Sequence, residues 1–272
     1  MPKFPFVQID AFASQAFEGN QACVMPMDAF LADDTLQKIA AENNVAETAF
    51  IVPAEDGVWQ LRWFTPAKEV PLCGHATLAA GHYLYHHGGY SGAQITFRTR
   101  QSGELLVSRV GEDLLEMDFP ALTFTETAPS DEIIAALGKP PVRAFDGPFY
   151  VALFERAADI KALEPDLTRL TELGGGPDSW GAGNFGCLAL DGDGVDVTSR
   201  FFAPGSGIPE DPATGSWHCL VAPLVHQLTG KSSAKCFQAY PGRGAYIATE
   251  LSGDRVKLRG QSVSVIEGTF SL

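Results

Sequence analysis

Three titratable residues are the side chains of this sequence best suited to acid–base chemistry. His75 follows a Cys-Gly pair, and a histidine changes charge near neutral pH, as a general acid or base must. Glu47 opens an apolar run, where desolvation favours the protonated carboxyl that a proton-shuttling acid needs. Asp211 precedes Pro212, so it could cap a helix or position a ligand. An isolated residue of any of these types is more often solvated or structural.

A motif that occurs twice connects these residues. The stretch from Phe64 matches the stretch from Phe202 without gaps, and the same alignment places Cys73 over Asp211. The offset is 138 positions (202 minus 64), whereas solenoid repeats run to about 20–50 residues. The duplication therefore predicts two related half-domains. We expect Cys73 and Asp211 in equivalent places, opposed across one cleft.

Each copy of the motif runs into a turn of small residues before a stretch with helical spacing. The turns are Gly74-His75-Ala76-Thr77 and Ala213-Thr214-Gly215-Ser216. Unpaired N–H groups and the helix dipole at such a turn favour an anion, for example a substrate carboxylate. Either turn alone is more often an ordinary helix start, but their duplication beside titratable residues favours a binding role. We expect a carboxylate to contact the N–H groups at 74–76 and 214–216.

The elements that position these turns form two sheet-rich halves, expected at 1–127 and 128–272. The first half has strand patterns at 7–12, 22–25, 48–52, 59–64, 95–100, 105–110 and 114–119, with helices from Asp33 and from Ala76. The second has strand patterns at 149–154, 187–190, 195–202, 246–249 and 263–266, with helices at 129–137 and after Pro212. One dominant helix in each half predicts an α+β fold rather than βαβ winding.

Composition argues against several classes of function. The 272 residues are 45% hydrophobic and carry a formal net charge of −14, which does not suit nucleic acid or a polybasic membrane contact. No run approaches the roughly 20 apolar residues of a membrane span, and no signal-peptide pattern is present. Five cysteines without metal-type spacing are typical of reduced thiols in the cytoplasm. No glycine-rich motif indicates a nucleotide cofactor.

Four motifs together closely resemble those of the phenazine-biosynthesis PhzF-like isomerase family. They are Gly19-Asn20-Gln21-Ala22-Cys23, Asn44-Val45-Ala46-Glu47-Thr48-Ala49-Phe50, Cys73-Gly74-His75-Ala76-Thr77 and Glu210-Asp211-Pro212-Ala213-Thr214-Gly215-Ser216. The resemblance extends over essentially the whole chain. It implies the diaminopimelate-epimerase-like fold: two pseudo-symmetric lobes, each a curved, barrel-like, mostly antiparallel sheet around a central helix. It also implies cofactor-free acid–base chemistry and commonly a homodimer.

The same resemblance implies roles for individual residues. Glu47 matches the family's proton-transferring carboxylate, and His75 and Asp211 match its other catalytic side chains. The implied substrate-binding residues are Asn20, Gly74, Ala76, Thr214, Gly215 and Ser216. In the phenazine enzyme the carboxylate moves a proton within a dihydro-hydroxyanthranilate, which shifts a double bond and turns an enol into a ketone. We therefore expect an isomerase that acts on a small carboxylate-bearing metabolite.

Two alternatives stay open at this point. Amino-acid epimerases and racemases of this fold carry protons on two opposed cysteines, and Cys73 resembles the first of them. Because Asp211 is aligned with the second, a two-thiol racemisation lacks one carrier. An epimerase in which Cys73 is essential would contradict this interpretation. The other alternative is a binding protein that keeps the fold and the cleft but catalyses nothing.

Overall fold

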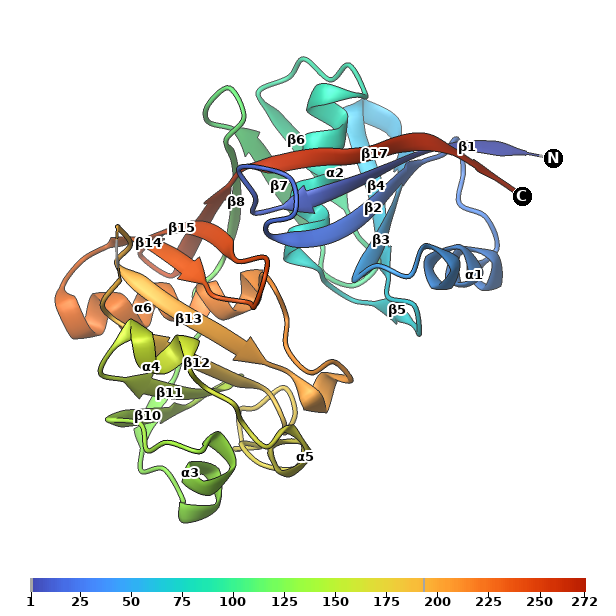
Figure 1. Ribbon diagram of the computed structural model, residues 1–272. Helices are drawn as coiled ribbons and strands as arrows, with labels where there is room; N and C mark the ends of the chain where they lie inside the picture. Colours follow the sequence, from blue (N-terminus) through green and yellow to red (C-terminus); the bar gives the residue numbers. More distant parts are fainter. Residues whose placement is uncertain (1, 193) are drawn as a thin grey trace. The chain divides into compact units, whose positions relative to one another are not determined.

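The computed structural model describes residues 2–192 and 194–272, and its contacts divide the chain into two units (Figure 1). One unit runs to Asp118 and includes Arg259–Leu272, and the other is Phe119–Leu258. The expected halves, 1–127 and 128–272, differ from this division at residues 119–127, which belong to the second unit, and at the carboxyl end. The difference arises because β17 (Ser262–Ser271) pairs antiparallel with β1 (Lys3–Ala11). In Figure 1 the red β17 accordingly lies beside the blue β1.

The elements of each unit follow one another along the chain. The first unit contains β1, β2 (Asn20–Pro26), α1 (Asp33–Asn43), β3 (Glu47–Pro53), η1 (Glu55–Gly57), β4 (Val58–Phe64), β5 (Glu69–Val70), α2 (Gly74–His86), β6 (Gln94–Arg98), β7 (Glu104–Arg109) and β17. The second contains β9 (Thr125–Thr127), α3 (Asp131–Leu137), β10 (Arg143–Asp146), β11 (Tyr150–Phe154), α4 (Ala157–Lys161), α5 (Leu167–Leu170), β12 (Phe185–Ala189), β13 (Val197–Phe202), η2 (Pro204–Ser206), α6 (Gly215–Thr229), β14 (Ser233–Gln238) and β15 (Ala245–Ser252). The division falls within β8 (Leu115–Pro120) and β16 (Arg255–Gly260). None of the helices described is both long and apolar enough to cross a membrane.

Strand pairing in the first unit is repeated in the second. In the first, β2 is parallel to β3, β3 antiparallel to β4, β4 parallel to β6, and β6 antiparallel to β7. In the second, β11 is parallel to β12, β12 antiparallel to β13, β13 parallel to β14, and β14 antiparallel to β15. The predicted α+β class and duplication are confirmed. The parallel pairs were not predicted: their connections contain helices, among them α2 after β4 and α6 after β13.

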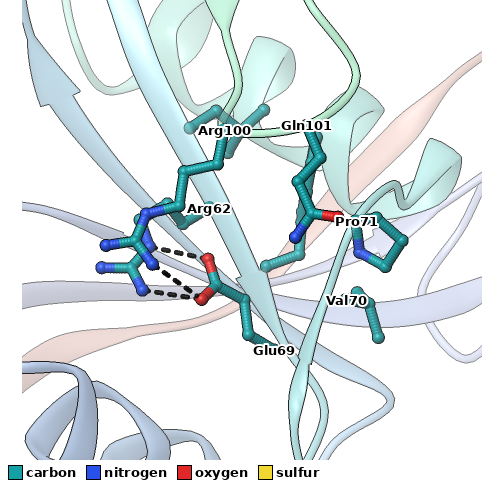
Figure 2. A pocket seen from close by; sticks show the side chains of 8 residues that line it. Arg62, Glu69, Val70, Pro71, Arg100 and Gln101 are labelled. Atoms are coloured by element: carbon teal, nitrogen blue, oxygen red, sulfur yellow. Dashed lines mark hydrogen bonds and ion pairs between the residues drawn. The ribbon is translucent and has the colours of Figure 1, made fainter.

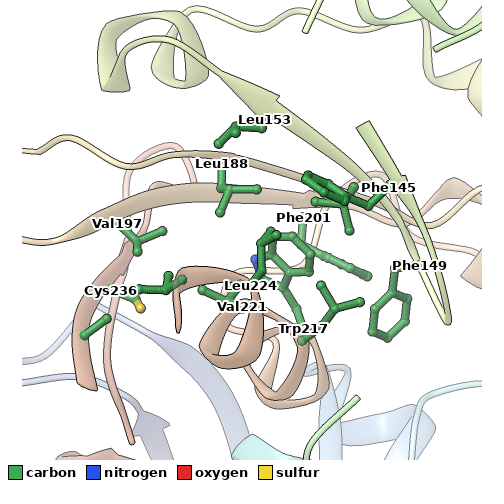
Figure 3. Close-up of a cluster of buried hydrophobic side chains, with 14 of the residues drawn as sticks. Phe145, Phe149, Leu153, Leu188, Val197, Phe201, Trp217, Val221, Leu224 and Cys236 are labelled. Carbon is green, nitrogen blue, oxygen red and sulfur yellow. The ribbon is translucent and has the colours of Figure 1, made fainter. Parts of the chain in front are cut away.

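The helices α2 and α6 are the buried centres of their units. All residues of α2 from His75 to Tyr85 are buried, and the helix contacts β1, β2, β3, β7 and β17. Small side chains permit this close packing, since a Cβ on Gly81 would lie 2.7 Å from the Val107 side chain. In the second unit, α6 packs an apolar face against the sheet (Figure 3), with Trp217, Val221 and Leu224 opposite Phe145, Leu188 and Phe201. Burial of each such large side chain contributes about 1.5–3 kcal/mol.

An arginine–glutamate pair whose arginine is buried precedes each central helix. In the first unit, Nε and Nη2 of Arg62 donate to the two carboxylate oxygens of Glu69, each at 2.8 Å (Figure 2). Arg62 also lies 2.9 Å from Asp33. In the second unit, Arg200 donates to both oxygens of Glu210 at 2.8 and 2.7 Å. The two pairs hold the returning chain against the strand that precedes it.

These pairs correct the alignment of the two halves. Phe64 pairs with Glu69, and Phe202 forms a bridge with Glu210. The offset is therefore 138 positions at the phenylalanines (202 minus 64) but 141 at the glutamates (210 minus 69). The three extra residues of the second copy lie in the segment that contains η2.

The predicted equivalence of Cys73 and Asp211 is therefore wrong. The offset of 141 continues to the helix starts, because α2 begins at Gly74 and α6 at Gly215. The residue that precedes each helix is Cys73 in the first unit and Thr214 in the second. An alignment without gaps cannot detect an insertion. The insertion is evident only from the strand pairing.

Three histidines lie at the carboxyl end of α2. His82 and His86 are stacked with their ring centroids 4.3 Å apart, and Nε2 of His82 and of His87 lie 3.1 and 2.8 Å from Oγ of Ser264 on β17. Burial, and then the positive charges of His86, His87 and Arg109, lower the pKa of His82 to about 3. The folded state therefore holds His82 neutral.

Acid is expected to destabilise the fold through such histidines. Burial also lowers the pKa of His218 on α6 to about 4, against its backbone hydrogen bond. Because the unfolded chain binds these protons near pH 6.5, stability is complete above that pH and is lost progressively as the pH falls towards the folded values, by up to about 1.4 kcal/mol per pH unit for each histidine. In acid titrations followed by circular dichroism, His82→Phe should unfold at lower pH. Replacement of the exposed His226 by Gln should not change the midpoint; an unchanged midpoint for His82→Phe would contradict the prediction.

Candidate active site

Asn20 is held in place by the turn that begins β2. Gly19 has φ +61°, and a Cβ there would lie 2.1 Å from the carbonyl oxygen of Ala11, so this turn requires glycine. The buried Asn20 places Nδ2 3.2 Å from Nδ1 of His75. This contact fixes the orientation of the imidazole ring.

The central contact of the site joins His75 to Glu47. Glu47 is the first residue of β3, and His75 is the second residue of α2. Nε2 of His75 lies 2.9 Å from Oε2 of Glu47, and the two side chains are 6% and 16% exposed. The motifs assigned a catalytic role to each residue but did not predict the contact, because it depends on how α2 packs against the sheet.

Cys73 completes the cluster from the residue before α2. Its Sγ lies 3.6 Å from Nδ1 and 4.0 Å from Nε2 of His75. One ligand-type atom from each of Glu47, Cys73 and His75 lies within 4.8 Å of the others, so the three side chains could also hold a metal ion. Cysteine spacing alone did not reveal this set, since the carboxylate belongs to Glu47 on β3, far from Cys73 in the sequence.

Burial and neighbouring charge set the protonation of this cluster. Burial raises the pKa of the Cys73 thiol, and the nearby Glu47 carboxylate raises it further. For His75, burial opposes protonation, while a Cys73 thiolate and the Glu47 carboxylate both raise the pKa well above its ordinary value; of these two charges, only that of Glu47 is present while Cys73 keeps its proton. The Glu47 carboxylate therefore favours an imidazolium at His75, with Cys73 as a neutral thiol, and in that state Nδ1–H of His75 requires the oxygen rather than the nitrogen of the Asn20 amide as its partner.

The predicted residues of the second unit gather at the start of α6. The Thr214 hydroxyl donates to Oδ2 of Asp211 at 2.6 Å, and the Thr214 N–H donates to Oε1 of Gln238 at 3.0 Å. Nε2 of Gln238 donates to the Asp211 carbonyl oxygen at 2.6 Å. Gly215 is buried and Ser216 half-buried. Sequence reasoning missed Gln238 because it missed β14, whose small and polar residues give a weak strand pattern.

The two helix starts have equivalent hydrogen bonds to a backbone carbonyl but different side chains at the position of His75. The Thr77 hydroxyl donates to the Cys73 carbonyl at 2.6 Å, and Nδ1 of His218, 141 positions later, donates to the Thr214 carbonyl at 2.8 Å. At the same offset, Ser216 takes the place of His75. The carboxylate–imidazole–thiol cluster therefore belongs to the first unit only.

The structure thus brings Asn20, Glu47 and His75 together with Cys73. Gly74 and Ala76 follow in the first turn of α2, where Gly74 is half-buried and Ala76 fully buried. In the second unit, the Thr214 hydroxyl donates to Asp211. The catalytic and substrate-binding roles assigned to these residues stay predictions, as does the expectation that both turns face one cleft.

Comparison with known proteins shows the family to which the chain belongs. A family model described as phenazine biosynthesis-like protein matches residues 9–268. The chain belongs to this family. An uncharacterized isomerase of Pseudomonas aeruginosa is 41% identical over 268 residues, 98% of each chain. The phenazine biosynthesis-like domain-containing protein of Homo sapiens is 36% identical over 291 residues, 99% of each chain.

Solved structures of the PhzF family have the same fold. The PhzF family protein of Enterococcus faecalis matches with a TM-score of 0.93 and 32% identity over 100% of both chains. A hydroxyproline epimerase from Agrobacterium vitis matches with a TM-score of 0.57 and 12% identity over 98% of this chain and 92% of that one, which shows a similar fold alone. The predicted family resemblance and fold are confirmed. Family and fold together support a general isomerase or epimerase role.

Proposed function

We propose that the protein is an isomerase that moves a proton on a small carboxylate-bearing metabolite, without a cofactor, and so shifts a double bond or converts an enol into a ketone. The observation that carries this proposal is the contact of 2.9 Å between the Glu47 carboxylate and the His75 imidazole. A carboxylate that is mostly shielded from water, with a partner that stabilises its charge, is suited to carry a proton between two atoms of one substrate.

The proposed reaction leaves the atom count of the substrate unchanged. The Glu47 carboxylate removes a proton from one carbon, and the electron pair of the broken C–H bond moves into the conjugated system. The protonated Glu47 then returns the proton to a second carbon. The His75 imidazolium balances charge on Glu47 in the resting state, and Asn20 holds its ring in place.

The substrate carboxylate is proposed to bind backbone N–H groups at the helix starts. The chain carries a formal net charge of −14, so a local attraction must offset general repulsion of an anion. Such N–H and dipole contacts contribute about 0.3–2 kcal/mol each. Gly74 in the first unit, and Gly215 and Ser216 in the second, are the proposed donors, because the N–H groups of Ala76 and Thr214 already donate to Cys73 and Gln238. Asp211 is the proposed partner of a hydroxyl or amino substituent. The homodimer, the cytoplasmic location and the biosynthetic role stay predictions.

Hydrogen exchange tests the proposed reaction without a known pathway. Candidate substrates, among them a dihydro-hydroxyanthranilate and simpler unsaturated carboxylic acids, are incubated with the protein in D2O and followed by proton NMR. The expected result is a shifted double bond, with deuterium at the newly protonated carbon to the extent that Glu47 exchanges with solvent. Binding of these acids without conversion or exchange would instead favour the non-catalytic binding alternative.

An epimerase that depends on Cys73 is the second candidate, because the thiol contacts the same imidazole at 3.6 Å. We expect Cys73→Ser to retain most activity, since burial and Glu47 raise the pKa of the thiol and Thr214 occupies the equivalent place in the second unit. Steady-state kinetics of the serine variant measure this directly. Complete loss of activity, together with deuterium incorporation at a stereocentre by the unmodified protein, would favour the epimerase.

A further inference from the structure

We propose that Glu47, Cys73 and His75 form a binding site for one thiophilic divalent cation such as Zn²⁺, and that its binding reversibly blocks proton transfer. The donor atoms of these three side chains converge within 4.8 Å. In the part of the chain that the structure describes, this is the only group of three or more such side chains with this convergence. One cation per chain is therefore expected.

Two of the interatomic distances are within about half an ångström of those in a zinc site. Tetrahedral bonds of about 2.0 Å to nitrogen and oxygen and about 2.3 Å to sulfur place nitrogen and sulfur about 3.6 Å apart and nitrogen and oxygen about 3.3 Å apart. Nε2 of His75 lies 4.0 Å from Sγ of Cys73 and 2.9 Å from Oε2 of Glu47. Because Sγ of Cys73 lies nearer Nδ1 of His75, at 3.6 Å, and the sulfur and carboxylate donors are only within 4.8 Å of each other, the Cys73 side chain must move by more than about 1 Å to bring all three donors onto one ion at Nε2. Three protein ligands leave a fourth position for water.

The donor set selects the type of cation. Thiolate and imidazole suit Zn²⁺ and Co²⁺, whereas Mg²⁺ and Ca²⁺ take oxygen ligands. On binding, the Cys73 thiol and Nε2 of the His75 imidazolium release their protons to solvent. One thiolate, one carboxylate and a neutral imidazole then balance the two positive charges, so the buried site becomes neutral.

Asn20 is the positioning residue of this site. It contacts Nδ1 of His75 at 3.2 Å and leaves Nε2 directed towards Glu47. When Nε2 binds a cation, Nδ1 carries the remaining ring proton, for which the Asn20 amide oxygen is the acceptor. Loss of such an outer hydrogen bond typically weakens metal binding by about 10–100-fold.

The blocking step rests on the proposed function, whereas binding does not. A cation on Oε2 of Glu47 occupies the lone pair that would otherwise take the substrate proton. Zn²⁺ is therefore expected to inhibit the exchange reaction, and a chelator is expected to restore it. If Zn²⁺ binds but leaves exchange unaffected, the blocking step is wrong. If no probe undergoes exchange, the proposed function fails while the binding result stands.

Binding is tested with Co²⁺, which absorbs strongly in the near ultraviolet when a thiolate coordinates it. Metal-free, reduced protein is titrated with Co²⁺, and Zn²⁺ is then added as competitor. We expect a thiolate charge-transfer band that saturates at one equivalent and disappears on addition of Zn²⁺. The band should be absent in Cys73→Ser and unchanged in Cys236→Ala, which removes a buried thiol of the second unit.

Two further variants keep the test decisive if Cys73→Ser fails to fold. Glu47→Gln retains the thiol and the side-chain shape, and should weaken Zn²⁺ binding at least about tenfold in calorimetric titration, as expected for loss of a direct ligand. Asn20→Ala should weaken it by about 10–100-fold. No thiolate band in the unmodified protein, or a band that persists in folded Cys73→Ser, would overturn the proposed site.

Discussion

Glu47→Gln is expected to lower kcat by about 10²–10⁴-fold, the usual contribution of a general acid–base group. Glutamine keeps the length and shape of the side chain but cannot take up or release a proton at neutral pH. The His75 contact at 2.9 Å would change from an ion pair to a neutral hydrogen bond, so the active site should keep its geometry. Steady-state kinetics on a probe that the exchange experiment identifies measures the loss, and KM should change much less than kcat.

Two companion variants separate the role of Glu47 from general effects. Glu42→Gln removes an exposed carboxylate from α1 and should leave kcat unchanged. Glu47→Asp keeps the acid but shortens its reach, and should retain more activity than Glu47→Gln. Near-normal turnover by a folded Glu47→Gln variant would exclude Glu47 as the proton carrier.

Local signals in the sequence predicted the elements that present the site. Aromatic strands followed by small-residue turns predicted helices near Ala76 and after Pro212, which are α2 and α6. A helix was also predicted at 129–137, where α3 begins and the Ser130 hydroxyl accepts a hydrogen bond from the Ile133 N–H. Such features can be predicted from the sequence because each depends on residues a few positions apart.

Long-range pairing could not be predicted in the same way. Nothing local to residues 262–271 indicates that β17 pairs with β1 at the other end of the chain. The contact between Glu47 and His75 likewise depends on the packing of α2 against β3. The three-residue insertion before Glu210 changed which residue is equivalent to Cys73, and only strand pairing located it.

Glu210→Gln is expected to lower the free energy of unfolding by about 3–5 kcal/mol, because it leaves a buried charge without its partner. The side chains of Arg200 and Glu210 are only 8% and 9% exposed. Nη1 of Arg200 also donates to the Leu163 carbonyl at 2.6 Å, and the guanidinium lies 4.7 Å from the Phe202 ring centroid. The arginine is therefore fixed in place and cannot turn to solvent. Denaturant unfolding of the isolated variant measures the loss.

A matched control distinguishes burial from hydrogen-bond geometry. Arg143 donates to both oxygens of Glu126 at 2.7 Å, the same two-pronged arrangement as in the Arg200 pair, but these side chains are 37% and 52% exposed. Because solvent screens that pair, Glu126→Gln should lower the free energy of unfolding much less than Glu210→Gln. The loss of unfolding free energy for Glu69→Gln should lie between those for Glu126→Gln and Glu210→Gln, since Arg62 keeps its contact with Asp33. If Glu210→Gln lowered the free energy of unfolding no more than Glu126→Gln, burial would not determine how strongly these arginine–glutamate pairs stabilise the protein.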